Sequence, residues 1–174
     1  MIVNILFVIV LLIVAVLLYA TTKPDSFSIQ RSITIKATPE KIAALINDFN
    51  RWPLWSPWEK LDLAMKKTMS GAANGPGSIY EWEGNKKVGQ GRMEILQSSA
   101  SQIKIKLDFL KPFEAHNITI FDLQSQGDIT VVTWNMSGSN NYIGKLMHMF
   151  INVDKMVGND FEKGLAALKE QAEG

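Results

Sequence analysis

The segment from Arg51 to Lys60 constrains the fold of this chain most strongly. It places three of the five tryptophans and two of the six prolines within ten residues. Pro53 and Pro57 lack a backbone N–H and push the preceding residue out of the α region, which predicts a stiff, extended or turning loop. Three indoles on a loop need an apolar surface to cover. The loop therefore either plugs the end of a hydrophobic core or lines the mouth of a cavity.

The composition indicates one domain with a sizeable core and an additional segment at one end, because 47% of the 174 residues are hydrophobic. A formal net charge of +1 at pH 7 supplies no strong field, so we expect no nucleic-acid partner. The chain has no cysteine and two histidines, His116 and His148. We therefore expect no disulfide, no thiol nucleophile, no metal site and no cofactor.

The N-terminal segment is apolar over residues 2–20 apart from Asn4 and Tyr19. As a helix it would span roughly 28 Å, close to the hydrocarbon thickness of a bilayer. A signal peptide and a buried core helix are the alternatives, but no basic residue precedes the apolar segment. We expect a transmembrane anchor over residues 1–21 and a linker over residues 22–26. The nearest Lys and Arg residues follow the span, which favours a cytoplasmic domain on a single-pass membrane protein.

Alternating apolar and polar residues predict antiparallel strands with one dry face through much of the remaining chain. Leu61 to Lys66 is ambiguous, and Ser70 to Gly77 is rich in turn residues. We expect about seven strands in one sheet. The segments with the clearest alternation are 27–36, 78–83, 91–96, 103–109, 116–123 and 129–136.

Two segments have helical patterns. Thr38-Pro39-Glu40 supplies a cap, a proline and an acid at the start of a short helix that leads into the tryptophan loop. From about Asn140 onward, apolar residues at helical spacing predict one long amphipathic helix that would break, if anywhere, near Gly158 or Gly164. This helix has the only long apolar stripe available to cover the sheet. We therefore expect an α+β fold in which a curved sheet wraps on the C-terminal helix and encloses a cavity.

Several short motifs accompany this order of elements: residues 31–33, 37–40, 52–58, 89–93 and 160–165. With them the chain resembles the START-like helix-grip superfamily. Within that superfamily it is similar to the polyketide cyclase/dehydrase and lipid-transport (SRPBCC) group, in versions with an N-terminal membrane segment. The resemblance implies a helix-grip domain over residues 27–174 with a hydrophobic-ligand cavity between helix and sheet. Members include lipid carriers, aromatic-ring cyclases, plant ligand binders and chaperone activators, so the fold does not select one activity.

Few polar residues offer catalytic chemistry. A catalytic triad would need His116 or His148 as its base, but a strand-edge position and a partly exposed helix position are the simpler interpretations. Glu81 and Glu83 share the strand face opposite two aromatic residues, so we expect both carboxylates to point to water. No residue is assigned a catalytic role.

Candidate ligand contacts are mainly aromatic and sulfur-bearing. Arg31 interrupts the apolar face of the first strand, where it would either pair with an acid of a neighbouring element or bind a ligand carboxylate or phosphate. The same apolar side chains would equally fill a solid core, and the sequence leaves core and cavity open. The candidate ligand-binding residues are Arg31, Trp55, Trp58, Tyr80, Trp82, Phe109, Trp134, Met136, Met147 and Phe150.

The leading functional hypothesis is a membrane-anchored domain that binds a hydrophobic small molecule or lipid without covalent chemistry. One alternative is a cyclase/dehydrase-like enzyme that holds a flexible apolar substrate and uses one polar group for proton transfer. Another is a membrane-tethered interaction module whose tryptophan loop engages a protein or the lipid interface. In the first case the loop closes one end of the sheet, with Trp52 buried and Trp55 or Trp58 bordering the cavity.

Overall fold

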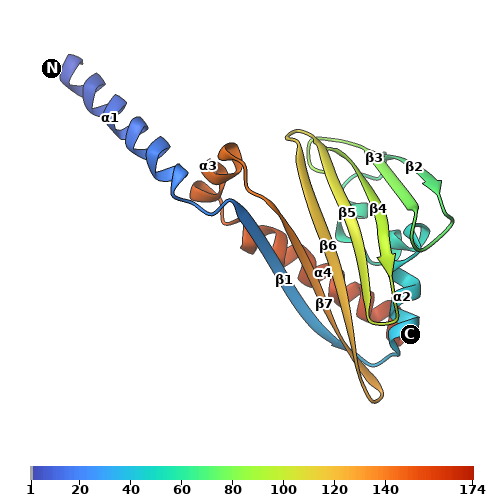
Figure 1. Ribbon diagram of the computed structural model, residues 1–174. Coiled ribbons are helices and arrows are strands. Elements are labelled where there is room, and N and C mark those ends of the chain that lie inside the picture. Colours follow the sequence, from blue (N-terminus) through green and yellow to red (C-terminus); the bar gives the residue numbers. More distant parts are fainter. Residues whose placement is uncertain (1) are drawn as a thin grey trace.

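From the second strand to the seventh, each strand pairs with the next one in the sequence, and the first strand pairs with the seventh (Figure 1). The computed structural model describes residues 2–174, without the side chain of His148. Within that range one antiparallel sheet has the strand order β1-β7-β6-β5-β4-β3-β2, which confirms the predicted α+β helix-grip fold. The strands are β1 (Ser26–Ile35), β2 (Lys66–Gly71), β3 (Ser78–Glu83), β4 (Gln90–Ser98), β5 (Gln102–Lys111), β6 (Ala115–Gln126) and β7 (Ile129–Ser139).

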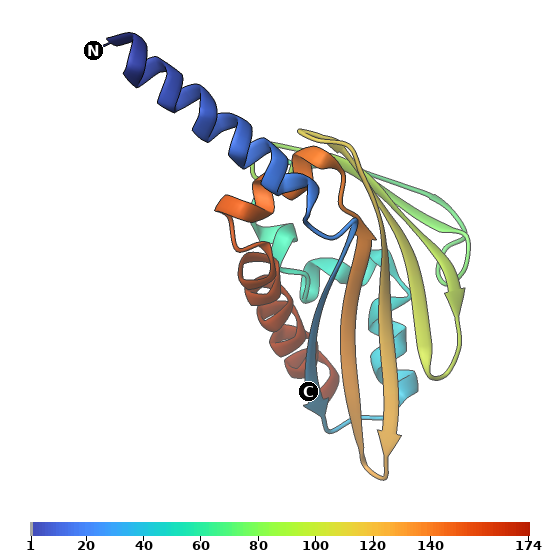
Figure 2. The same cartoon turned by 60° about the vertical axis from the view of Figure 1, so that its left-hand side comes forward.

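The inner face of the sheet carries the core, as the alternation predicts. On β7, Val132, Trp134 and Met136 are buried while the residues between them are half-exposed. Trp134 lies at the centre of this core, where its ring stacks on Phe161 with centroids 4.2 Å apart and an interplanar angle of 5°. Figure 2 shows the helices of the domain on one side of the curved sheet, so that side encloses the interior.

Strand β2 is not predicted by its sequence pattern. Lys66 belongs to an ambiguous segment, and Ser70 and Gly71 belong to a segment with turn residues. All six residues of the strand are exposed, and it pairs with β3 at the edge of the sheet. An edge strand that is wet on both faces needs no apolar alternation, and its lysines discourage pairing with other chains. The pattern that identifies the other strands is therefore absent here.

The tryptophan loop is not extended. It forms two 3-10 helices, η1 (Phe49–Leu54) and η2 (Pro57–Lys60). Their i→i+3 bonds tolerate proline better than a long α-helix does, because so few backbone donors are needed in one turn. The prediction of a turning segment is correct in outline, and the prediction of an extended one is wrong.

The indoles of this segment hold the end of helix α2 (Pro39–Ile46). Trp52 Nε1 donates to the carbonyl oxygen of Ile46 at 2.9 Å, and Trp55 Nε1 donates to that of Leu45 at 3.1 Å. The last carbonyls of a helix have no partner inside it. The two tryptophans therefore satisfy the C-terminal end of α2 and are themselves buried, with 3% and 1% exposure.

The C-terminal segment is two helices, α3 (Tyr142–Phe150) and α4 (Val153–Glu173), rather than one. The break lies at Ile151–Asn152, where the Asn152 side chain accepts from the backbone N–H of Lys155 at 2.8 Å and caps α4. The two glycines proposed as breaks lie inside α4 and are buried. They allow close packing instead: a Cβ on Gly158 would overlap the Arg31 guanidinium, and one on Gly164 would lie 2.9 Å from the Trp134 ring.

Helix α1 (Ile2–Thr21) projects away from the domain (Figure 1). Among helices of the described chain, it alone is long and apolar enough to cross a membrane. Ala20 is its only fully buried residue, at the end that joins the domain. The helix therefore presents apolar side chains along nearly its whole length.

Candidate ligand cavity

A cavity of about 400 Å³ lies between the inner face of the sheet, the two 3-10 helices and α4. Its volume falls within the range of small-molecule sites, which are typically about 300–1,000 Å³. The walls are mostly apolar side chains contributed by β3 to β7 and by α4. The structure therefore favours the cavity interpretation over a solid core.

Seven of the ten predicted ligand-binding residues line this cavity. They come from η2, from the inner faces of β3, β5 and β7 and from α3, so segments far apart in the sequence meet here. These residues are Trp58, Tyr80, Trp82, Phe109, Trp134, Met136 and Met147.

Arg31 lies outside the cavity lining, although it faces inward from β1. Its Nη2 lies 3.1 Å from Oδ2 of Asp154, and its Nε lies 2.9 Å from Oε1 of Glu162, both on α4. The same guanidinium also packs against Gly158. The structure thus shows the ion-pair alternative, because β1 runs directly beneath α4 and the carboxylates meet the arginine there.

Trp55 and Phe150 are also placed outside the cavity lining. Trp55 is buried behind it, where its ring contacts Phe121 and Trp134 at centroid distances of 6.0 and 5.6 Å. Phe150 is 76% exposed near the end of α3. The break between α3 and α4 turns that part of the apolar stripe away from the cavity. Of the two tryptophans expected at its border, Trp58 lines it.

A buried carboxylate in the cavity wall was not predicted from the sequence. Glu59, on η2, has a side chain that is 5% exposed, and its Oε1 accepts a hydrogen bond from the Tyr80 hydroxyl at 2.7 Å. Its Oε2 pairs with the ammonium group of Lys67 on β2. Burial, followed by the bond to Glu59, raises the pKa of Tyr80, so its hydroxyl stays protonated at neutral pH.

Two further buried polar atoms belong to cavity-lining residues. Asn117 Oδ1 and Trp134 Nε1 have no hydrogen-bond partner within the described structure. Buried polar atoms in proteins nearly always have a hydrogen-bond partner. The Asn117 acceptor and the Trp134 donor are therefore available to bond polar groups of a ligand in the cavity. Asn117 is an inward residue of a predicted strand, but its amide was not singled out.

The other polar candidates lie away from the cavity. His116 Nδ1 is 2.8 Å from Asp108 Oδ1, and the hydrogen bond to Asp108 raises the pKa of His116. Glu81 and Glu83 are exposed, as predicted. The side chain of His148 lies outside the described residues. In the part of the chain that is described, no three His, Cys, Asp or Glu side chains gather as a metal site.

The sequence between residues 26 and 173 matches the model of the polyketide cyclase/dehydrase and lipid transport family. The chain belongs to this family. The match covers the whole helix-grip domain and leaves out α1. Family membership thus agrees with a domain built around a ligand cavity. A comparison with curated proteins found no matching sequence.

Solved structures share the fold of this family member at low sequence identity. Protein CV1439 from Chromobacterium violaceum has a TM-score of 0.60 and 14% identity, covering 87% of this chain and 99% of that one. The Aha1 dimer from Colwellia psychrerythraea gives 0.56 and 19%, covering 84% and 96%. The di-domain ARO/CYC StfQ from the steffimycin biosynthetic pathway gives 0.63 and 9%, covering 85% of this chain and 51% of StfQ. At these identities the likeness shows the helix-grip fold alone.

Proposed function

We propose that this chain is a membrane-anchored domain that binds a hydrophobic small molecule or lipid in its cavity. The observation that carries the proposal is the cavity of about 400 Å³ with largely apolar walls. Each 100 Å² of apolar ligand surface buried there contributes about 2.5 kcal/mol before the cost of association. Family membership supports the same class of function.

Orientation of the ligand comes from the few polar groups of the wall. Asn117 Oδ1 accepts a hydrogen bond from a ligand hydroxyl or amine, and Trp134 Nε1 donates one to a ligand oxygen. The Tyr80–Glu59 pair adds a fixed, buried hydroxyl and carboxylate. Arg31 is not part of the proposed site, since Asp154 and Glu162 hold its guanidinium.

Membrane attachment is assigned to α1, with the anchor over residues 1–21, the linker over 22–26 and the ligand-binding domain over 27–174. The exposed apolar surface of α1 supports this division. The basic residues Lys23, Arg31 and Lys36 follow the span, which favours a cytoplasmic domain.

The test is native mass spectrometry of the full chain extracted from its own membrane, with analysis of the molecules it releases. We expect one copurified hydrophobic compound per chain. Val157→Phe places a ring in the cavity wall and is expected to lower that occupancy at least several-fold. Val131→Phe makes the same change at a half-buried residue outside the cavity and should leave the occupancy unchanged. A compound-free wild-type chain, or equal occupancy in both variants, would refute the proposal.

A second candidate function is conversion of the bound compound. The specific observation in its favour is the buried Glu59–Tyr80 pair in the cavity wall, because a carboxylate there could exchange a proton with a substrate. Incubating the chain with its copurified compound would reveal a product of altered mass or, for an isomerisation, of altered chromatographic retention, and Glu59→Gln should abolish it. An unchanged compound at full occupancy would exclude this candidate.

The interaction-module alternative gains no support from the tryptophan loop. Trp52 and Trp55 are buried, and Trp58 is half-buried against the core. The indoles that would engage a partner are therefore already covered by the domain itself.

A further inference from the structure

One end of the domain exposes a cluster of large apolar side chains. Most come from α3, with others from the start of α4 and from the turn between β5 and β6. Their exposed fractions reach 76% at Phe150 and 57% at Phe113. Large exposed apolar side chains gathered at one end of a domain in this way mark an interaction site. We call it the apolar rim, made of Phe113, Tyr142, Ile143, Met147, Phe150 and Met156.

The apolar rim is fixed beside the end of α1. The Tyr142 hydroxyl donates to the carbonyl oxygen of Leu17 at 2.9 Å, so α3 is bonded directly to the last turns of the apolar helix. The linker is held as well: Asn140 N donates to the carbonyl oxygen of Asp25 at 2.7 Å, and Lys145 Nζ pairs with the Asp25 carboxylate. Figures 1 and 2 both show α3 against the end of α1. A helix that crosses a bilayer therefore leaves it next to the rim.

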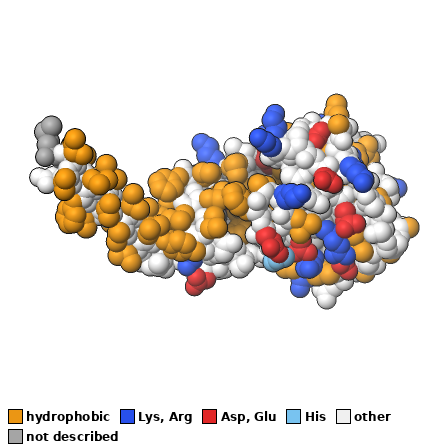
Figure 3. Space-filling model, turned by 90° about the horizontal axis from the view of Figure 1, so that it is seen from above, with side chains coloured by type: hydrophobic (Ala, Val, Ile, Leu, Met, Phe, Trp, Pro, Cys, Tyr) orange, Lys and Arg blue, Asp and Glu red, His pale blue; other side chains and the backbone are white. Residues whose placement is uncertain are grey.

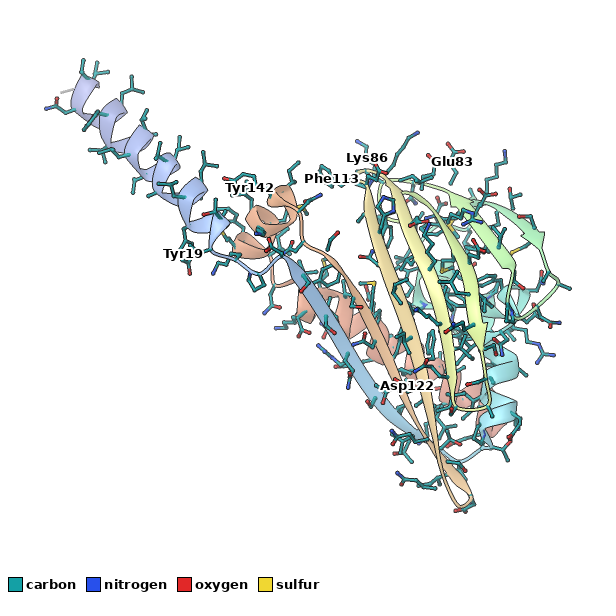
Figure 4. The ribbon with its side chains drawn as sticks, in the orientation of Figure 1. Tyr19, Glu83, Lys86, Phe113, Asp122 and Tyr142 are labelled. Atoms are coloured by element: carbon teal, nitrogen blue, oxygen red, sulfur yellow. The ribbon has the colours of Figure 1, made fainter. Side chains whose placement is uncertain are left out.

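Apolar side chains continue from α1 onto the adjoining end of the domain (Figure 3). Figure 4 shows Tyr142, Phe113 and Lys86 at this end, with Asp122 toward the other. Strand β6 runs from Ala115 near the rim to Gln126, which at about 3.3 Å per residue separates the two ends by roughly 36 Å. The continuity between the span and the rim points to lipid as the partner, rather than to a second protein.

The mouth of the cavity overlaps the rim. Of the residues that line the cavity, the exposed ones are Lys87, Lys111, Pro112, Phe113, Met147 and Met156, and the rest are half-buried or buried. Three of these six also belong to the rim. The opening of the cavity and the exposed apolar surface therefore share one side at this end of the molecule.

Lysines at the mouth suit an anionic lipid surface, and they stand among the exposed carboxylates Glu83 and Glu114 at the same end of the domain. Lys87 and Lys111 are exposed lining residues, and Lys86 adjoins Lys87 in the turn between β3 and β4. A lysine close to an anionic leaflet strengthens binding by roughly fivefold. In a membrane, the lysine ammonium groups would contact anionic headgroups while the apolar side chains beside them contact the acyl layer.

We infer that the apolar rim lies in the bilayer surface and that the cavity exchanges its ligand directly with the membrane. This inference rests on the proposed function, because it takes α1 as the anchor and the cavity as the binding site. Phe113 and Phe150 insert among the lipids, and Met147 and Met156 border the path between the acyl layer and the cavity. The ligand is thereby a lipophile that dissolves in the bilayer and is small enough for a cavity of about 400 Å³.

The position of the rim is tested with single cysteines, since the chain has no cysteine of its own. Cysteines at Phe113, Phe150, Ile9 and Asp128 carry an environment-sensitive fluorophore, one at a time. Each full chain is reconstituted in phosphatidylcholine vesicles with phosphatidylserine and a spin-labelled quenching lipid. We expect strong quenching at positions 9, 113 and 150 and little at 128, in the turn between β6 and β7.

The outcomes separate the two proposals. Quenching at position 9 without quenching at 113 and 150 overturns the inference and leaves the anchor intact. No quenching at position 9 overturns the anchor itself. A fluorophore at 150 that is shielded from lipid, with emission that depends on the protein-to-lipid ratio, would show a second copy on the rim and would also overturn the inference.

The loading path has its own test. Phe150→Asp changes a rim residue outside the cavity lining, so equilibrium occupancy by a fluorescent fatty acid should stay the same. Transfer of that probe from vesicles into the cavity should slow by about tenfold. Burying a phenyl ring in lipid favours the inserted state by about tenfold or more in its equilibrium constant, and the aspartate removes that gain. Leu96→Asp, an exposed residue of β4 that does not line the cavity, should not slow it. Equal transfer rates in the two variants would contradict loading through the rim.

Discussion

Tyr80→Phe tests whether the buried pair in the cavity wall is an energetic unit. The substitution removes one oxygen from a residue that is 3% exposed and deprives Glu59 Oε1 of a donor at 2.7 Å. Lys67 remains paired with the other carboxylate oxygen. A hydrogen bond to a charged group has a net value of about 1.5–3 kcal/mol. We therefore expect the free energy of unfolding to fall by about 2 kcal/mol.

Urea unfolding of the full chain in detergent micelles, followed by far-ultraviolet circular dichroism, measures this change. With an m-value of about 2 kcal/mol/M, the midpoint should fall by about 1 M. Tyr142→Phe is the matched control, because it removes a hydroxyl that bonds a backbone carbonyl from a residue that is 43% exposed. Because this bond is between neutral groups and outside the buried pair, its loss should cost about 1 kcal/mol or less.

A double-mutant cycle with Glu59→Gln gives the coupling directly. Residues in one buried network usually show interaction energies of about 0.5–3 kcal/mol. If Tyr80→Phe shifts stability no more than Tyr142→Phe, or if the effects at Tyr80 and Glu59 simply add, the pair does not stabilise the cavity wall.

Three further predictions concern the rest of the domain. Gly158→Ala should lower the melting temperature, although helix propensity alone favours alanine by about 1 kcal/mol, because the new Cβ would displace the Arg31 guanidinium; a higher melting temperature would contradict this. Trp55→Phe leaves a helix carbonyl of α2 without its donor, at a cost of about 1–3 kcal/mol, and differential scanning calorimetry should show a fall of several degrees. His116→Ala should destabilise most at acid pH. The hydrogen bond to Asp108 raises the folded pKa of His116, so its contribution is complete below the unfolded value and disappears as the pH rises through the folded one. A pH-independent difference in melting temperature would rule out that ion pair.

Much of the fold follows from the sequence because strands β3 to β7 each have one wet and one dry face. Edge strand β2 is exposed on both faces and carries no such signal. The division between α3 and α4 was missed for a related reason. Apolar residues continue across Ile151, but Ile143 and Phe150 on α3 are exposed, while Phe161, Leu165 and Leu168 on α4 are buried. The residue that marks the boundary in the sequence is Asn152. It caps α4 and directly follows Ile151, at the end of α3.

The cavity could be predicted where strand alternation decides the direction of a side chain. Tyr80, Trp82 and Trp134 are inward residues of regular strands and line the cavity as expected. Glu59 was missed because its direction depends on the 3-10 turn that follows Pro57, and no periodicity describes a single short turn. An acid beside two tryptophans, in a segment expected to cover the core, is the signal that would have drawn attention to it.

The bonded linker also restricts where a bound molecule can travel. Asp25 is fixed to Asn140 and Lys145, so few free residues remain between the apolar helix and the domain. Anchored as proposed, the domain cannot swing across an aqueous gap or shuttle between two organelles or envelope layers. On that proposal it serves only the bilayer that holds α1. Any onward delivery then requires a soluble acceptor that comes to the domain, or a second membrane brought within reach of the same mouth.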